Sequence, residues 1–163
     1  DMPASPHSTT LYTLGHGIVS IAAWSGTTPP VSLTDVGNSP RFEVEVTEET
    51  LDHYSSRSGT RNKDKSVVLE TGYTLNFDLD EFAVNNLAMF LLGSVSGNVI
   101  SANVELDKWE FHRVTLRPGG ALNLISDEWS LMTFNGEGLS DTANNPTSPY
   151  FTVTFATTTT TTV

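Results

Sequence analysis

The sequence predicts a mainly β fold: an antiparallel β-sandwich or barrel with one short α-helix packed on it and a long inter-strand loop. Residues 41–48 carry the clearest strand pattern, because Phe42, Val44 and Val46 alternate with charged or polar neighbours. Residues 69–79 alternate in the same way, with mostly apolar side chains at the odd positions. Polar residues between the apolar ones favour antiparallel strands, because parallel strands covered on both faces show continuous apolar runs.

Shorter segments supply the remaining strands. We expect them at residues 18–24, 31–36, 98–106, 109–116, 122–125, 129–134 and 151–155. The inward apolar positions are even at Val104, odd at Phe111 and even again at Val114. Since a slip of one residue turns every side chain to the other face, we expect a bulge or tight bend near Lys108 and another near His112.

A helix is expected over residues 81–92. Its apolar residues recur at i, i+3, i+4 and i+7, which places them on one helix face. That packing face comprises Val84, Leu87, Ala88 and Leu91. Asp78 or Asp80 is a candidate N-cap, and Gly93 stands where a left-handed C-terminal cap is expected.

The length of 163 residues suits one domain, which we place at residues 11–155. Residues 1–10 form an N-terminal arm that is rich in Pro, Ser and Thr and has no apolar period. Residues 156–163 form a C-terminal tail with six consecutive threonines. Because a homopolymer has no pattern that fixes strand register, we expect this tail, like the arm, to be ordered only by contact with another chain.

Charge and composition exclude several classes of function. Nineteen acidic and eight basic residues give a formal net charge of −11, whereas stable DNA binding needs a basic surface. There are no cysteines, so disulfides and thiolate metal sites are excluded. The longest apolar run, residues 87–92, is too short to cross a bilayer, and we expect no membrane insertion by this chain.

Paired carboxylates are the strongest candidates for catalysis, because two of them can hydrolyse a glycosidic bond. Glu43 and Glu45 share one strand face, about 7 Å apart by strand rise, and further acids cluster at residues 78–81 and 127–128. An outward strand face, a helix N-terminus and a polar turn explain all of them without catalysis. The four histidines are scattered and form no metal-binding motif. We therefore expect a protein that is not an enzyme, with no catalytic residues, metal site or cofactor.

Residues 49–65 stand out, because an irregular loop of this length is uncommon in a compact domain. The segment carries four of the eight basic residues on an otherwise acidic chain, together with aromatic residues of the kind enriched at contact surfaces. A disordered segment or a hairpin tip is the alternative interpretation. The candidate contact residues are Leu51, Asp52, His53, Tyr54, Arg57, Arg61, Lys63, Asp64 and Lys65.

The same segment carries a family resemblance. Residues 51–59 read Leu-Asp-His-Tyr-Ser-Ser-Arg-Ser-Gly, residues 61–65 read Arg-Asn-Lys-Asp-Lys, and Val-Leu-Glu and Asn-Leu-Ala follow at 68–70 and 86–88. In this order the residues resemble the tail tube, or major tail, proteins of bacteriophages with long non-contractile tails. The resemblance is strongest over residues 15–93. The sequence departs from the family pattern at Val84, where the family usually has Pro near the helix start.

The resemblance implies a structural virion protein that forms hexameric rings, stacked into a tube whose lumen is a β-barrel built from all subunits. It implies that residues 49–65 contact the adjacent ring and that the two terminal arms make further contacts between subunits. The implied partners are other copies of the chain, the tape-measure protein in the lumen, and tail terminator and distal tail proteins at the ends. Viral DNA would pass through without specific binding, and the protein would reside in the virion tail after assembly in the host cytoplasm.

Lumen lining, by the same resemblance, falls on residues 41–48 and 68–79. The candidate lumen-facing acids are Glu43, Glu45, Glu70 and Asp78. A ring of negative charge would repel DNA from the wall. A plain solvated sheet face explains these residues equally well.

Two alternative functions remain open on the sequence. A ring protein of the type VI secretion tube shares the implied architecture. A carbohydrate-binding β-sandwich would instead be a monomer that uses exposed Trp24, Trp109 or Trp129 as a sugar platform.

Overall fold

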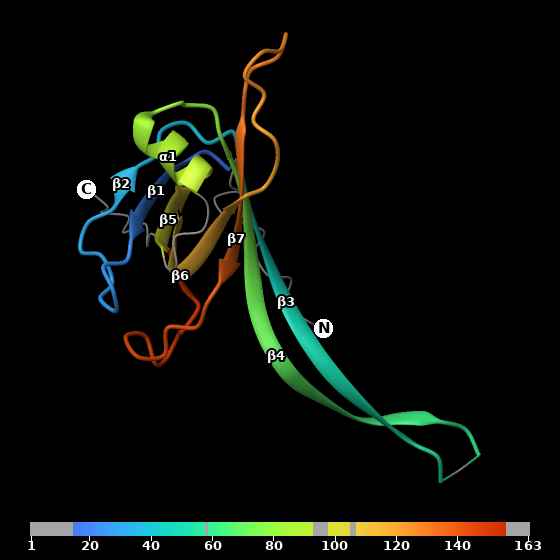
Figure 1. The fold of residues 1–163 in the computed structure, drawn as a ribbon. Helices are drawn as coiled ribbons and strands as arrows, with labels where there is room; N and C mark the ends of the chain where they lie inside the picture. Colours follow the sequence, from blue (N-terminus) through green and yellow to red (C-terminus); the bar gives the residue numbers. More distant parts are fainter. Residues whose placement is uncertain (1–14, 58, 93–97, 105–106, 156–163) are drawn as a thin grey trace, which may run out of the picture.

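The structure, a computed structural model, describes residues 15–57, 59–92, 98–104 and 107–155 and confirms a mainly β chain with one helix (Figure 1). The elements are β1 (Gly17–Ala23), β2 (Thr34–Asp35), β3 (Arg41–Ser55), β4 (Asn62–Leu79), α1 (Val84–Leu92), β5 (Asn98–Val104), β6 (Asp107–Pro118), β7 (Met132–Gly138) and β8 (Phe151–Phe155). The expected N-terminal arm at residues 1–10, the tail at 156–163 and the cap at Gly93 lie outside the described residues. Among the described helices none is long and apolar enough to span a membrane.

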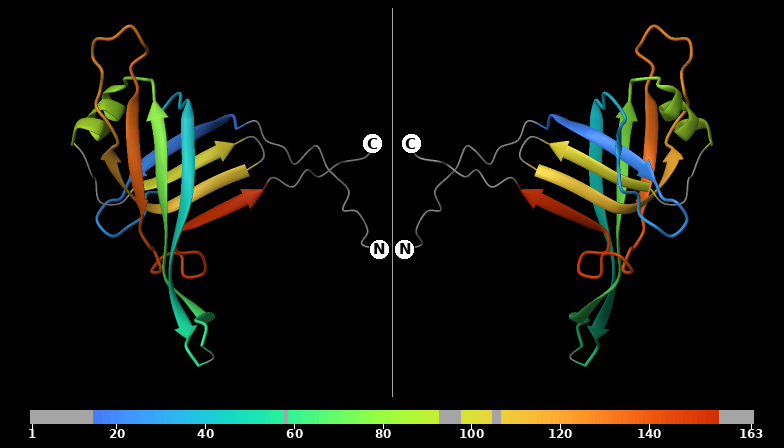
Figure 2. Two further views of the ribbon diagram at one scale, coloured as in Figure 1. Left: turned by 90° about the vertical axis from the view of Figure 1, so that its right-hand side faces the viewer. Right: turned by 90° about the vertical axis from the view of Figure 1, so that its left-hand side faces the viewer.

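All strand pairs are antiparallel, and β6 belongs to two groups of strands. The strand order is β2-β1-β5-β6-β7-β4-β3, and β8 also pairs with β6. The first half of β6 pairs with β8, whereas its second half pairs with β7. Figure 2 shows β3, β4 and β7 running crosswise to β1, β5 and β8, so the sheet folds over on itself around β6.

A bulge in β6 lets both halves of the strand face the core. Asn98 pairs with Val114 and Ile100 with Phe111, so β6 has one extra residue at this point. The expected bulge near His112 is therefore confirmed, and Phe111 and Val114 are both fully buried. The expected bulge or tight bend near Lys108 is confirmed as a tight bend, because Val104 of β5 pairs antiparallel with Asp107 of β6 and the chain reverses direction just before Lys108.

The core fills the space inside the folded sheet. Tyr73, Leu75 and Phe77 from β4 are almost completely buried, as is Phe134 from β7. The ring of Phe77 stacks on that of Phe134 at 5.1 Å, and Tyr73 lies 5.4 Å from the ring of Phe111. Aromatic pairs of this kind contribute about 0.5–1.5 kcal/mol each beyond their buried area. They pack β4 against β7 and against β6.

Helix α1 packs on β7 through a face that differs from the predicted one. Phe90 is buried edge-on against Phe134, and the buried Asn86 side chain donates a hydrogen bond to the Val36 carbonyl at 2.7 Å. Val84 and Leu91 are 83% and 68% exposed, so their place in the predicted packing face is wrong. The pattern failed because the buried face includes a polar residue, Asn86.

Of the other residues predicted for that face, Leu87 packs against the core and Ala88 is half-buried. Neither predicted N-cap is at the helix start, because the first helical residue is Val84. Asp78 binds Arg41 instead, and Asp80 accepts a hydrogen bond from Asn38.

Residues 49–65 form a twisted two-stranded ribbon with a turn at its end, so the expected irregular loop is wrong. Strands β3 and β4 stay paired as far as Ser55 and Asn62, with register shifts after Glu49 and His53. Gly59 adopts φ +77° in the turn, a conformation that L side chains rarely adopt. Figure 1 shows the ribbon extending far from the rest of the domain.

Residues 119–131 contain no strand, although the sequence predicts strands at residues 122–125 and 129–134. The chain is irregular until β7 begins at Met132. The expected strand at residues 31–36 shortens to the two residues of β2.

Candidate assembly surfaces

The strands β3, β4, β7 and β6 together present one polar face. Direct cross-strand partners share a face, and the register aligns polar residues in three rows. The rows are Arg41, Asp78 and Thr133; Glu43, Asn76, Asn135 and Arg117; and Glu45, Thr74, Glu137 and Thr115. The opposite face of the same strands carries the core residues, so the polar face points away from the domain interior.

All four candidate lumen acids lie on this polar face, and three of them are exposed. Glu43, Glu45 and Glu70 are exposed, and Glu70 pairs directly with Glu49 on β3. Sequence reasoning misses two further acids of this face, because Glu49 falls in the predicted loop and Glu137 lies beyond the strand predicted at residues 129–134. The alternation of Thr133, Asn135 and Glu137 with apolar or small residues could have revealed the second of these.

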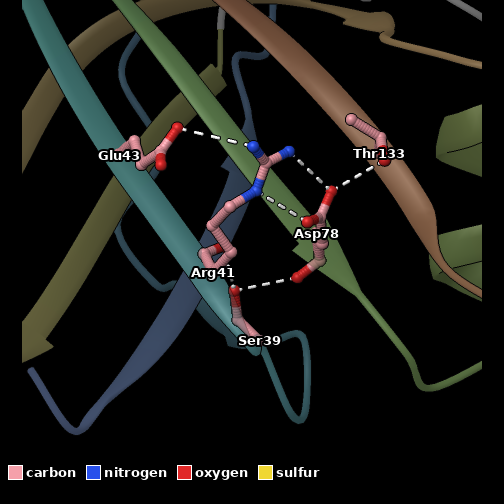
Figure 3. Close-up of polar contacts among 5 residues, drawn as sticks. All are labelled: Ser39, Arg41, Glu43, Asp78 and Thr133. Carbon is pink, nitrogen blue, oxygen red and sulfur yellow. Dashed lines mark hydrogen bonds and ion pairs between the residues drawn. The ribbon is translucent and has the colours of Figure 1, made fainter.

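Asp78, the fourth candidate acid, is only 7% exposed and is bound within the sheet (Figure 3). The Arg41 side chain donates from Nε to Oδ2 at 2.7 Å and from Nη2 to Oδ1 at 3.1 Å, and Thr133 donates to Oδ1 at 2.7 Å. Ser39 donates to the backbone carbonyl of Asp78 at 2.9 Å. Asp78 therefore lies on the polar face but is not a free acid there, because these donors bind its carboxylate in place of water.

This network sets the protonation of Asp78. Burial by itself raises the pKa of the carboxyl, but the hydrogen bonds from Arg41 and Thr133 and the charge of Arg41 outweigh it and hold the pKa below its ordinary value of 3.8. The hydrogen bonds to Asp78, followed by its charge, raise the pKa of the Arg41 guanidinium in turn. Both groups stay charged at neutral pH.

The polar face is acidic overall. Its carboxylates are Glu43, Glu45, Glu49, Glu70, Asp78 and Glu137, and its basic groups are Arg41 and Arg117. Arg41 binds Asp78 and lies 3.5 Å from Glu43, and Arg117 lies 3.7 Å from Glu137. Both cations are thus matched by acids of the same face, and the remaining carboxylates leave an excess of negative charge.

The tip of the ribbon brings together the residues predicted for contact with another chain. Asp52 accepts hydrogen bonds from Lys63 at 2.7 Å and from Ser66 at 2.6 Å, which lowers its pKa, and Asp64 lies 2.6 Å from His53. These contacts hold the two strands in register across the twisted ribbon.

Other cations and apolar groups of the tip point into water. Arg61 lies over the Tyr54 ring at 5.6 Å, and Arg57 and Lys65 are exposed. Leu51 and Val67 pair directly across the ribbon, and both are exposed. Exposed apolar and basic groups in one place are typical of a contact surface.

Other kinds of site find little support in the described parts of the chain. No group of three or more His, Asp or Glu side chains there could hold a metal ion. Trp24 donates a hydrogen bond to the His112 carbonyl at 3.2 Å and lies against Arg113, and Trp109 packs on the core. Of the three tryptophans weighed for a sugar platform, only Trp129 is fully open to solvent.

One solved structure with a similar fold comes from a tail assembly. A chain in the tail of an empty gene transfer agent (GTA) particle with C6 symmetry aligns with a TM-score of 0.50 and 8% identity, covering 86% of this chain and 96% of that chain. At this identity the likeness shows a shared fold.

Two more solved structures are similar. The anti-feeding prophage cap, which terminates the tube, aligns at a TM-score of 0.49 and 13% identity over 96% of this chain and 97% of that one. A chain in the virion of a native gene transfer agent aligns with a TM-score of 0.46 and 9% identity, covering 86% of this chain and 95% of that chain.

Sequence comparison identifies a family. No curated protein matches the chain in sequence. A family pattern does match over residues 12–105, which include β1 to β5, the ribbon and half of the polar face. The chain belongs to the family described as protein of unknown function UCP028589.

Proposed function

We propose that this chain is the structural subunit of a phage-type tail tube. Six copies form a ring, the rings stack into a hollow tube, and the tube encloses a tape-measure protein and later conducts DNA. The observation that carries the proposal is the one-sided acidic face of β3, β4, β7 and β6 on a sheet whose outer strand, β3, has β4 as its only partner among the described strands. The shared fold with a chain of a C6-symmetric particle tail supports six copies per ring.

The free edges of this sheet support a closed barrel. Strand β3 pairs only with β4 among the described strands, and residues 115–118 of β6 extend beyond the pairing with β5. Unpaired edges of this length promote irregular association unless another strand covers them. Because β3 and β6 are the first and last of four antiparallel strands, β3 of one copy would run antiparallel to β6 of the next, and the pattern would continue around the ring.

The acidic polar face then becomes the wall of the lumen. Phosphates of passing DNA would meet mainly carboxylates there, with the two arginines already matched by Asp78 and Glu137. Like charges repel across the channel and keep the nucleic acid from adhering to the wall. The acids of the wall thus favour passage over binding.

The ribbon tip provides the contact between rings in this proposal. Replacing Arg57, Arg61 and Lys65 together with Glu should leave the subunit folded and abolish tubes, which negative-stain electron microscopy of concentrated protein would show. Arg57→Lys, Arg61→Lys and Lys65→Arg form the matched control, because they keep the charges and should still give tubes.

The outcomes separate the competing interpretations. Tubes of normal length from the glutamate variant would contradict the role of the tip. Isolated rings from the unaltered protein at every concentration would favour a secretion-type ring instead.

A further inference from the structure

The connection between β6 and β7 exposes large apolar side chains that no part of the described subunit covers. Within residues 119–131, Leu124, Ile125 and Trp129 are 79%, 98% and 93% exposed. Asp127 and Glu128 lie between them, and the segment contains no basic residue. We refer to residues 119–131 as the acidic loop. Loops of this length without regular structure are uncommon in compact domains and are usually functional.

The acidic loop is held in shape by its own contacts. Gly119 donates a backbone hydrogen bond to Thr133 at 2.7 Å, which closes the base of the loop, and Leu122 packs against the core. Ser130 donates to the Asn123 carbonyl at 2.5 Å, and Ser126 to the Glu128 carbonyl at 2.8 Å. The apolar side chains are thus held in water by a structured loop, at a cost that burial against another chain would remove.

The acidic loop and the ribbon tip lie at opposite ends of the subunit. In Figures 1 and 2 the loop projects beyond one end of β7, and the ribbon extends from the other end of the domain. The tip carries Arg57, Arg61 and Lys65 beside exposed Leu51 and Tyr54. Both surfaces therefore combine exposed apolar groups with charge, and the signs of the charge are opposite.

We propose that the acidic loop receives the ribbon tip of a second copy of this chain. The inference rests on the proposed tube and names the surface on which the tip docks in the adjacent ring. Trp129 and Ile125 pack against the apolar residues of the tip, as aromatic anchors do at the centre of interfaces. Asp127 and Glu128 bind the cations of the tip and fix the orientation of the contact.

Cross-linking tests the contact directly, because the chain has no cysteine. The double variant Thr60→Cys, Ser126→Cys places one thiol at the ribbon tip and one on the acidic loop. In assembled tubes, oxidation or a short bismaleimide should give a ladder of covalent oligomers on a denaturing gel. Each single variant should remain monomeric, and a mixture of the two should stop at dimers.

Several results would overturn the inference. A double variant that forms normal tubes but stays monomeric on the gel excludes the contact and leaves the tube proposal intact. Dimers from Thr60→Cys alone would show that tips meet tips. Failure of the unaltered protein to form tubes would refute the proposed function itself, and the inference with it.

Charge exchange provides the second test. Asp127→Lys with Glu128→Lys should abolish tubes while leaving the subunit folded, and adding the three glutamate substitutions at Arg57, Arg61 and Lys65 should restore them. Val31, which is also fully exposed, provides a control: Val31→Ala should assemble normally, whereas Trp129→Ala should not. Normal assembly of the double lysine variant, or its failure to be restored, would contradict the contact.

Discussion

The Asp78 carboxylate is almost completely buried in the sheet and owes its charge to Arg41 and Thr133. Its pKa in the folded protein is below the ordinary 3.8. A carboxyl with a lowered folded pKa stabilises the fold above its unfolded pKa, and this stabilisation is lost as the pH falls through the folded value. Acid should therefore weaken the junction between β3, β4 and β7.

Asp78→Asn tests this at one position. At neutral pH the variant should unfold with a free energy lower by about 1–3 kcal/mol, because a charged hydrogen-bond acceptor is lost. Between neutral pH and about pH 3 the unaltered protein should lose more stability than the variant, since the variant has no proton to bind at this position. Urea denaturation at both pH values measures the difference. Equal losses in the two proteins would show that Asp78 does not contribute to the pH dependence.

Single residues were predictable where the strand pattern was local. The exposed face of Glu43, Glu45 and Glu70 follows from alternation alone. The burial of Asp78 could not be foreseen, because its partner Thr133 lies 55 residues away in the sequence and on a strand whose register was unknown. An alternating pattern assigns a side chain to a face, but it does not say which other side chains share that face.

The ribbon is the element whose stability should change most on assembly. Residues 62–73 of β4 pair only with β3, because the pairing of β4 with β7 covers Thr74 to Leu79. An isolated two-stranded ribbon is only marginally stable in water. Its amides should therefore exchange with solvent by local opening in the free subunit.

Hydrogen–deuterium exchange with mass spectrometry should show this contrast. Peptides from residues 50–55 and 63–68 should exchange quickly in the free subunit and slowly in tubes, because docking covers the tip. Peptides from residues 74–79 should be protected in both states. Ribbon peptides that exchange equally in subunit and tube would show that the ribbon contacts no neighbour.

Two elements were misjudged for related reasons. The ribbon was interpreted as a loop because no second layer covers it and its apolar residues consequently show no regular alternation. Residues 122–125 and 129–134 are predicted as strands because they contain Leu124, Ile125 and Trp129, which usually indicate a core. In both places apolar residues lie on the outside, where a pattern that assumes a monomeric core gives the wrong structure.

At the scale of the whole molecule, the net charge of −11 predicts whether the protein binds nucleic acid. The unaltered subunit should not bind duplex DNA at about 0.15 M salt, because few phosphates can be neutralised. Fluorescence anisotropy of a labelled duplex measures this. The variant Glu43→Lys, Glu45→Lys, Glu70→Lys should bind weakly and lose affinity as salt rises, which makes it the positive control. Salt-dependent binding by the unaltered subunit would contradict a repelling wall.

The class of fold was predictable from the sequence, but the arrangement of its strands was not. Antiparallel pairing, one helix and the bulge near His112 follow from alternation and its change of parity. That β6 joins two groups of strands depends on β7 and β8 pairing with different halves of one strand. Such long-range register leaves no periodic signal in either partner.

The opposite placement of the ribbon tip and the acidic loop has a consequence for growth. Under the proposed contact, each copy that docks covers one loop and offers an identical one, so the growing end is the same after every addition. The contacts between copies therefore do not determine the length of such a polymer, and its own geometry does not stop elongation. In a particle whose tail has a defined length, a different molecule must set that length.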